Sequence, residues 1–247
     1  MDDKQWVFGR HPVLEALAAN QPVEKVWLQQ GTRGEFEKEL RHLCRDLKIP
    51  MTVLPKDSIN RLVKGNHQGV VALLGAAAYQ QLDDILPFVY EKGETPLLLL
   101  LDGVTDVRNF GAIARSAELC GVHAVVIPAK GSAGLSAEAL KTSAGALARV
   151  PVCRVKSLVS TITFLQESGV RVLASDLSGD KYLHELDLTG PVALVLGSEG
   201  EGISKGVAAA ADRCFRIPQL GTLNSFNVSV ATGIMLYESM RQRSVVL

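Results

Sequence analysis

The stretch LLLLLDG (97–103) decides the fold class, because a strand that is apolar at every position has no face left for water. Strands of this kind occur in parallel sheets that helices cover on both faces. Its five leucines form an uninterrupted aliphatic run, and comparable stretches follow it. These are HAVVIP (123–128), PVCRV (151–155), VRVLASDL (170–177), PVALVLGSE (191–199) and FRIPQ (215–219).

Helical spacing between these stretches predicts an α/β domain over residues 96–247, built on a parallel sheet. The expected helices cover 109–120, 136–149, 157–168, 203–212 and a last segment from Ser225. In open sheets of this type, ligands bind beyond the carboxyl ends of the strands. The loops that matter are therefore DGVTDVRNFG (102–111), ASDLSGD (174–180), GSEGEG (197–202) and PQLGTLNSFN (218–227).

The first part of the chain has a different pattern of predicted helices and strands. Short strand-like and helix-like stretches alternate over residues 1–77, which predicts a separate small α/β domain. Residues 78–95 have a partly helical middle and end in a Gly-Glu-Thr-Pro break. We expect them to be a linker between the two domains.

Composition indicates an ordinary globular protein. Lysine plus arginine and aspartate plus glutamate both number 26 among 247 residues, so the formal net charge is zero. This neither favours nor excludes RNA, because a local basic patch is sufficient. The scattered cysteines indicate reduced thiols and no metal site. Without a secretory signal or an apolar run near the ~20 residues of a membrane helix, we expect a cytoplasmic protein and no membrane partner.

The segment NFGAIARSA (109–117) follows the 97–103 strand and a polar loop. Asn109 suits the N-cap of a helix, and Gly121 suits its end. Arg115 is not explained by folding: its side chain leans towards the helix start, where a ligand would lie. The alternative is a surface ion pair with Glu118, three residues further on. The buried stripe of this helix should consist of Phe110, Ile113, Ala114 and Ala117.

Two further segments can each be explained either by local folding or by ligand binding. GSEGEGIS (197–204) holds three glycines, which indicate either a tight turn or close approach of the backbone to a ligand. Its glycine order matches neither the dinucleotide fingerprint nor the phosphate loop, and Glu199 has no obvious local cation. In SFNVSVATG (225–233), Ser225 and Asn227 can cap a helix, and a helix start can also bind an anion or a carboxylate.

Taken together and in this order, these segments resemble the three motifs of the SPOUT methyltransferases, and more narrowly the TrmH (SpoU) branch, which methylates ribose 2′-hydroxyls of RNA. The resemblance extends to the first domain. FGRHPVLEAL (8–17) and NHQG (66–69) are similar to the ribosomal-protein-like (L30e-like) RNA-binding domain of bacterial 23S rRNA guanosine 2′-O-methyltransferases. This resemblance implies that the turns at these two segments contact RNA. The alternative is that they are ordinary solvated turns. The residues concerned are Arg10, His11, Lys64 and His67.

The resemblance also implies a deep trefoil knot at the end of the catalytic domain. The knot would bind S-adenosylmethionine, without a metal, in its three loops. Residues 224–229 would both cap the last helix and line this site. Leu196, Gly197, Ile217 and Phe226 fall on cofactor-contact positions, Phe226 where leucine is common. Asn109, Arg115, Glu199, Ser225 and Asn227 fall on active-site positions.

A homodimer is implied as well, with the active site at the subunit interface. We expect the last helix to pack against the partner, because its apolar residues cover more than one face. These residues are Ile234, Met235, Leu236 and Tyr237.

For the chemistry, a guanidinium keeps its proton, so Arg115 suits a phosphate contact better than the role of a base. The ribose proton could pass to water, to the phosphate or to Glu199. Ribosomal RNA is the expected substrate. Transfer RNA, a non-catalytic RNA-binding or assembly module, and a dinucleotide-dependent enzyme are the alternatives. The missing dinucleotide fingerprint disfavours the last of these.

Overall fold

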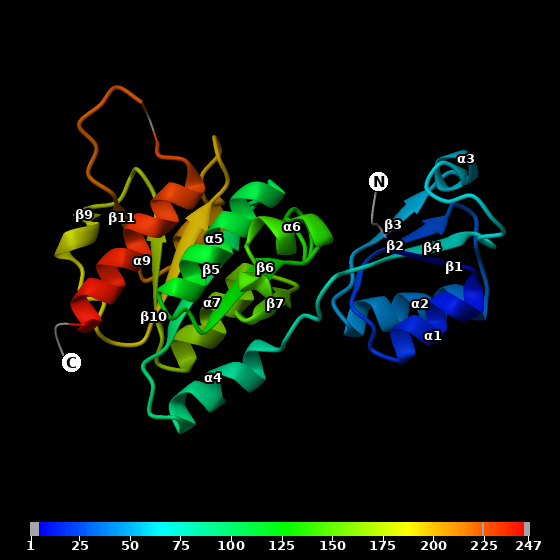
Figure 1. Ribbon diagram of the computed structural model, residues 1–247, viewed down its shortest axis with the longest axis horizontal. Coiled ribbons are helices and arrows are strands. Elements are labelled where there is room, and N and C mark those ends of the chain that lie inside the picture. Colours follow the sequence, from blue (N-terminus) through cyan, green and yellow to red (C-terminus); the bar gives the residue numbers. More distant parts are fainter. Residues whose placement is uncertain (1–4, 224, 245–247) are drawn as a thin grey trace. The chain divides into compact units, whose positions relative to one another are not determined.

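The computed structural model describes residues 5–223 and 225–244, which form two compact units (Figure 1). The first unit runs to Ala78 and includes 134–137, and the second comprises 79–133 and the chain from 138 onward. Each unit has its own sheet and its own hydrophobic core. Among the described residues, no helix combines the length and the apolar composition that crossing a membrane requires.

The first unit is a four-stranded sheet with helices, in which β2 and β3 run parallel and the other pairs antiparallel. In pairing order, the strands are β1 (Trp6–Phe8), β4 (Val70–Leu74), β2 (Val23–Gln29) and β3 (Met51–Leu54). The helices are α1 (Arg10–Ala18), α2 (Glu35–Asp46) and α3 (Lys56–Asn60). Val13 and Leu17 of α1 and Leu40 of α2 are buried in a core with β2 and β4.

The described residues of the second unit form a seven-stranded sheet in which all neighbouring strands run parallel, as predicted. β10 lies between β5 and β8, so strands distant in the sequence are neighbours. In pairing order, the strands are β7 (Val152–Val155), β6 (Ala124–Pro128), β5 (Leu97–Asp102), β10 (Val192–Gly197), β8 (Arg171–Ser175), β11 (Arg213–Arg216) and β9 (Lys181–Tyr182).

The central strands are buried on both faces, which confirms the argument from the aliphatic run. Residues Leu97–Leu101 of β5 are each 1% exposed or less, and Val192–Leu196 of β10 are each 2% exposed or less. Gly197 pairs in register with Asp102. Because both strands point the same way, the loops that follow β5 and β10 begin side by side.

Helices cover both faces of this sheet. They are α4 (Leu82–Glu91), α5 (Val107–Leu119), α6 (Ala137–Thr142), α7 (Leu158–Glu167), α8 (Lys205–Ala210) and α9 (Val228–Ser244). On one face, α4, α7 and α8 share a core with Leu98 and Leu100 of β5. On the other, α5 and α9 lie side by side (Figure 1). The stripe predicted for the 109–120 helix is buried on α5, as expected.

One predicted helix is wrong in extent. Instead of running over 136–149, the chain forms α6, turns, and then makes a short 3₁₀ helix at Ala146–Ala148. The backbone has φ of 50° at Ala144 and 83° at Gly145. Two successive residues in the left-handed region cannot continue a right-handed helix, and glycine makes that conformation accessible.

The segment 78–95, expected as a linker, contains α4 and contributes to the core of the second unit. Leu82, Ile85, Leu86 and Val89 are buried in the same cluster as the sheet residues. Their spacing of three and four residues places them on one face of the helix. Most of this segment is therefore a packed part of the second unit.

Arg243 ties the last helix to the amino ends of the two central strands. Its guanidinium donates to the carbonyl oxygens of Thr95 (2.8 Å), Pro96 (3.0 Å), Leu188 (3.0 Å) and Gly190 (2.8 Å). Thr95 and Pro96 precede β5, and Leu188 and Gly190 precede β10. Burial lowers the pKa of this guanidinium, and the four acceptors compensate for its loss of water.

Candidate functional site

The candidate site begins where β5 and β10 end. The backbone N–H of Ser204 donates to Asp102 Oδ2 (2.7 Å), which ties the loop after β10 to the end of β5. Within that loop, Ser198 and Gly202 exchange two backbone hydrogen bonds of 3.0 and 3.1 Å. The turn is so tight that a Cβ on Gly197 would lie 1.9 Å from the carbonyl carbon of Gly202. Gly197 is therefore required by close backbone approach.

Three polar side chains from three separate segments meet beside this turn. Asn109 Nδ2 donates to Glu199 Oε1 (3.0 Å), and Asn227 Nδ2 donates to the same oxygen. Asn227 Nδ2 also lies 3.2 Å from Asn109 Oδ1. The structure thus brings together three of the five predicted catalytic residues, which lie 28 to 118 positions apart in the chain.

Each asparagine is held by the start of a helix. Asn227 caps α9, because its Oδ1 accepts from the backbone N–H of Ser229 (3.0 Å), and this orients its Nδ2 towards Glu199. The prediction that Asn109 caps α5 is wrong. Asp106 is the cap and accepts from the N–H groups of Arg108 (2.7 Å) and Asn109 (3.1 Å). The Arg108 side chain and these N–H groups hold the pKa of Asp106 below its usual value.

A pocket of about 460 Å³ adjoins the cluster. It is lined by the segments that follow β8, β10 and β11 and by the start of α9, and Glu199 is one of its residues. All four residues predicted to contact a cofactor line it: Leu196, Gly197, Ile217 and Phe226. The titratable side chains in its lining are Asp176, Glu199, Glu201 and Arg216. The pocket therefore combines apolar surface with an excess of negative charge.

Within the part of the chain that the structure describes, the remaining two catalytic candidates, Ser225 and Arg115, are not hydrogen-bonded to this cluster. Ser225 lines the pocket, whereas Asn224 falls outside the described residues. Arg115 is exposed on α5 and has no hydrogen-bond or ion-pair partner within 5–223 and 225–244. The alternative pairing with Glu118 is not formed, because Glu118 pairs with Arg149 at 2.8 Å.

The first unit carries a second, polar pocket of about 890 Å³. Three of the four residues predicted to contact RNA line it: Arg10, His11 and His67. The fourth, Lys64, is exposed in the adjoining turn. His67 is only 6% exposed, so it supports the pocket more than it offers a surface. Sequence reasoning missed Arg33, Lys56 and Asn60, which also line the pocket.

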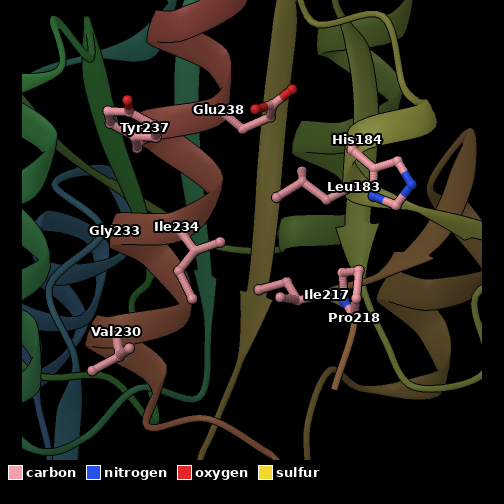
Figure 2. A pocket seen from close by; sticks show the side chains of 9 residues that line it. All are labelled: Leu183, His184, Ile217, Pro218, Val230, Gly233, Ile234, Tyr237 and Glu238. Atoms are coloured by element: carbon pink, nitrogen blue, oxygen red, sulfur yellow. The ribbon is translucent and has the colours of Figure 1, made fainter. Parts of the chain in front are cut away.

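An apolar groove of about 520 Å³ follows the outer side of α9 (Figure 2). Val230, Ile234 and Tyr237 line it from the helix, and Leu183 and Ile217 line it from other segments; of the three helix residues, Ile234 turns towards Leu183 and Ile217. Val230 is 50% exposed and Tyr237 is 59% exposed. Met235 and Leu236, which we expected to pack against a partner, are instead fully buried within their own chain. They lie on the side of α9 that faces the sheet.

Models of two protein families match the chain. The model of the SpoU rRNA methylase family covers residues 96–237. The model described as RNA 2′-O ribose methyltransferase substrate binding covers residues 6–80. The first match contains the hydrogen-bonded cluster and its pocket, and the second contains the polar pocket.

Related proteins agree with these matches. YacO of Bacillus subtilis, assigned to the TrmH family of tRNA/rRNA methyltransferases, is 35% identical over 98% of this chain and 97% of its own length. A tRNA/rRNA methyltransferase of Mycolicibacterium smegmatis is 39% identical over 98% of this chain and 78% of its own length.

Solved structures point to the same family. The SpoU methyltransferase AviRb of Streptomyces viridochromogenes, determined with the cofactor AdoMet, matches 98% of this chain and 91% of its own with a TM-score of 0.62 and 25% identity. The TrmH/SpoU tRNA modifying enzyme of A. aeolicus matches 66% of this chain and 85% of its own with a TM-score of 0.57 and 32% identity. The chain belongs to the SpoU (TrmH) family of RNA methyltransferases.

Proposed function

We propose that this enzyme transfers the methyl group of S-adenosylmethionine to the 2′-hydroxyl of a guanosine ribose in 23S ribosomal RNA. The observation that carries the proposal is the Asn109–Glu199–Asn227 cluster, which adjoins a pocket lined by all four predicted cofactor residues. The match of residues 96–237 to the SpoU rRNA methylase family favours ribosomal RNA. Transfer RNA is the second candidate, because the A. aeolicus structure is described as a tRNA modifying enzyme.

The pocket suits a cationic ligand better than a nucleotide with a pyrophosphate. Three carboxylates and one arginine line it, and a pyrophosphate would be repelled by that excess of negative charge. S-adenosylmethionine carries a positive sulfonium, from which the methyl group is transferred. Leu196, Ile217 and Phe226 supply the apolar surface that an adenosine would need.

We expect calorimetry to show saturable binding of S-adenosylhomocysteine and none of NAD, because the loop after β10 lacks the glycine spacing of dinucleotide and phosphate sites. The demethylated product is a suitable probe because it does not react. Saturable heat with NAD and none with S-adenosylhomocysteine would overturn the cofactor assignment.

In the proposed reaction, Glu199 positions and deprotonates the ribose 2′-hydroxyl. Its Oε1 accepts from Asn109 and Asn227, which fixes the plane of the carboxylate and leaves Oε2 to accept the proton. The guanidinium of Arg115 binds a neighbouring phosphate of the RNA, which holds the ribose in line for transfer. Ser225, which lines the pocket, contacts the ribose.

The proposal includes the chain topology. We propose that residues 96–247, with β10 inserted between β5 and β8 and α9 returning to α5, form a deep trefoil knot. Residues 1–77 would be the ribosomal-protein-like domain that binds the RNA. Both assignments are supported by the similarity to SpoU-family proteins over nearly the whole chain.

We also propose a homodimer in which two copies meet through the apolar groove beside α9. The stripe of Val230, Ile234 and Tyr237 repeats at helical spacing; Val230 and Tyr237 are exposed and Ile234 is half-buried. Tyr237→Asp should therefore convert a dimer to a monomer in light scattering and lower methylation. Phe88→Asp, at a residue of α4 that is 55% exposed, is the control and should stay dimeric. A wild-type monomer with full activity would contradict the dimer.

The product itself tests the function. Purified enzyme, S-adenosylmethionine and either 23S rRNA fragments or transfer RNA are incubated, and the RNA is cleaved with alkali. A 2′-O-methyl ribose cannot attack its own phosphodiester, so we expect a single gap in the ladder of the ribosomal RNA, at a guanosine. A gap in the transfer RNA alone would favour the second candidate, and no gap in either would refute 2′-O-methylation.

A further inference from the structure

The polar pocket of the first unit has the charge of a site for an anionic ligand. Arg10, Arg33 and Lys56 line it together with several amide side chains, and none of the described residues in its lining is acidic. The first 77 residues as a whole have nearly balanced charge. The lining of this pocket is therefore a local region of net positive charge, as expected where phosphates bind.

A buried histidine orients one of the amides. His67 Nδ1 accepts from the backbone N–H of Gly69 (3.0 Å), so the ring proton must lie on Nε2. Nε2 then donates to Asn60 Oδ1 at 2.7 Å. With its oxygen occupied, Asn60 presents its NH₂ group, which has no partner among the described residues, as a pair of donors in the pocket.

A second amide is held in the same way. Gln68 Oε1 accepts from the backbone N–H of Arg10 (3.1 Å), which leaves its own NH₂ group as a donor. The Arg10 side chain is ordered too, because its Nε donates to the Gln68 carbonyl (3.4 Å) and its guanidinium lies 5.1 Å from the centre of the Phe36 ring. The pocket therefore offers fixed donors and a fixed cation before any ligand arrives.

Such a concave site fits a nucleotide that protrudes from the RNA. In a paired A-form helix the major groove is too deep and narrow for side chains, and base edges are reached where nucleotides are unstacked. Oriented NH₂ groups can donate to a base edge, while arginine and lysine contact the flanking phosphates. A duplex could touch only the rim.

We propose that this pocket binds one unpaired nucleotide of the substrate RNA, with its base against Asn60 and Gln68 and its phosphates against Arg10, Arg33 and Lys56. This inference rests on the proposed function, since it names the RNA feature that the first unit reads. The enzyme would thereby select RNA with an unpaired nucleotide at a fixed distance from the methylated ribose.

The test compares the full chain bound to an RNA hairpin with one unpaired nucleotide and to the same stem fully paired. We expect the wild type to bind the first at least about tenfold more tightly, the order of one base-contact interaction. Asn60→Asp replaces the donors with a carboxylate and should abolish this difference. Gln21→Glu is the matched control, because it makes the same amide-to-carboxylate change at the opposite end of β2.

A second pair of variants tests the phosphate contacts. Arg33→Gln should weaken binding of the unpaired-nucleotide hairpin and reduce its salt dependence. Arg41→Gln removes the same charge from the exposed face of α2, where Arg41 pairs with Glu37, and should do neither.

The two proposals fail in different ways. If the wild type methylates ribosomal RNA but binds both hairpins equally, or if Asn60→Asp keeps the preference, the pocket assignment is wrong and the enzymatic function stands. If no RNA is methylated, the proposed function itself fails, whatever the hairpins show.

Discussion

Replacing Glu199 with glutamine is expected to lower kcat for RNA methylation by about 100-fold or more, since a positioned general base contributes on the order of 10²–10⁴-fold. Glutamine keeps the size of the side chain and an oxygen that can accept from Asn109 or Asn227. The variant should therefore fold normally and bind S-adenosylhomocysteine, and the loss should appear as reduced kcat at saturating RNA.

Glu201→Gln provides the matched control. Glu201 lies in the same turn and lines the same pocket, but it makes no hydrogen bond to the described residues. At saturating S-adenosylmethionine it should keep most of kcat, because the lost charge lies outside the hydrogen-bonded cluster. Equal losses in the two variants would assign the effect to the overall charge of the pocket, and near-normal kcat in Glu199→Gln would remove Glu199 from the reaction.

Gly197→Ala is expected to have the largest effect on the fold of the site. The added methyl group would lie 1.9 Å from the carbonyl carbon of Gly202 and 2.1 Å from the nitrogen of Ile203, both backbone atoms. Overpacking costs roughly 1–3 kcal/mol, and more where backbone must move. At the upper value the melting temperature should fall by roughly 6–12 °C, and binding of S-adenosylhomocysteine should be lost.

Gly206→Ala is the control for this substitution, nine residues further on. A Cβ on Gly206 would lie 3.5 Å from Val159 Cγ2, an ordinary contact. Gly206 is the second residue of α8, where alanine loses less backbone entropy on folding than glycine does. The two variants should therefore shift the melting temperature in opposite directions. A Gly197→Ala protein that melts like the wild type and binds ligand would show that the turn can open.

The parallel sheet could be predicted because burial on both faces leaves a clear mark, the uninterrupted apolar run of β5 and β10. The break between α6 and the 3₁₀ helix could not be predicted from the sequence. Alanine-rich sequence suits a helix, and only the left-handed backbone at Ala144 and Gly145 reverses the local preference. The two-residue strand β9 is set by pairing with β11, a contact that no local pattern shows.

The candidate site could also be predicted in part from the sequence. The loops that contain Glu199 and Asn227 predicted that both residues are functional. The sequence did not predict that Asn109 and Asn227 donate to the same oxygen of Glu199, because this depends on the order of the strands. Burial of Met235 and Leu236 depends on which side of α9 packs against the sheet. Because the apolar residues of this helix cover more than one face, the sequence does not show which side that is. The role of His67 in orienting Asn60 requires the coordinates, because it depends on which ring nitrogen accepts from Gly69.

The contacts of α9 have a consequence for biosynthesis. A 17-residue helix is about 26 Å long, longer than six-residue strands of about 20 Å. Asn227 can therefore bond at one edge of the sheet while Arg243 bonds at the other. A chain growing on the ribosome makes β5 and β10 before α9. Until α9 docks, Glu199 lacks one of its two amide donors, and the nascent enzyme is expected to remain inactive in the presence of ribosomal RNA.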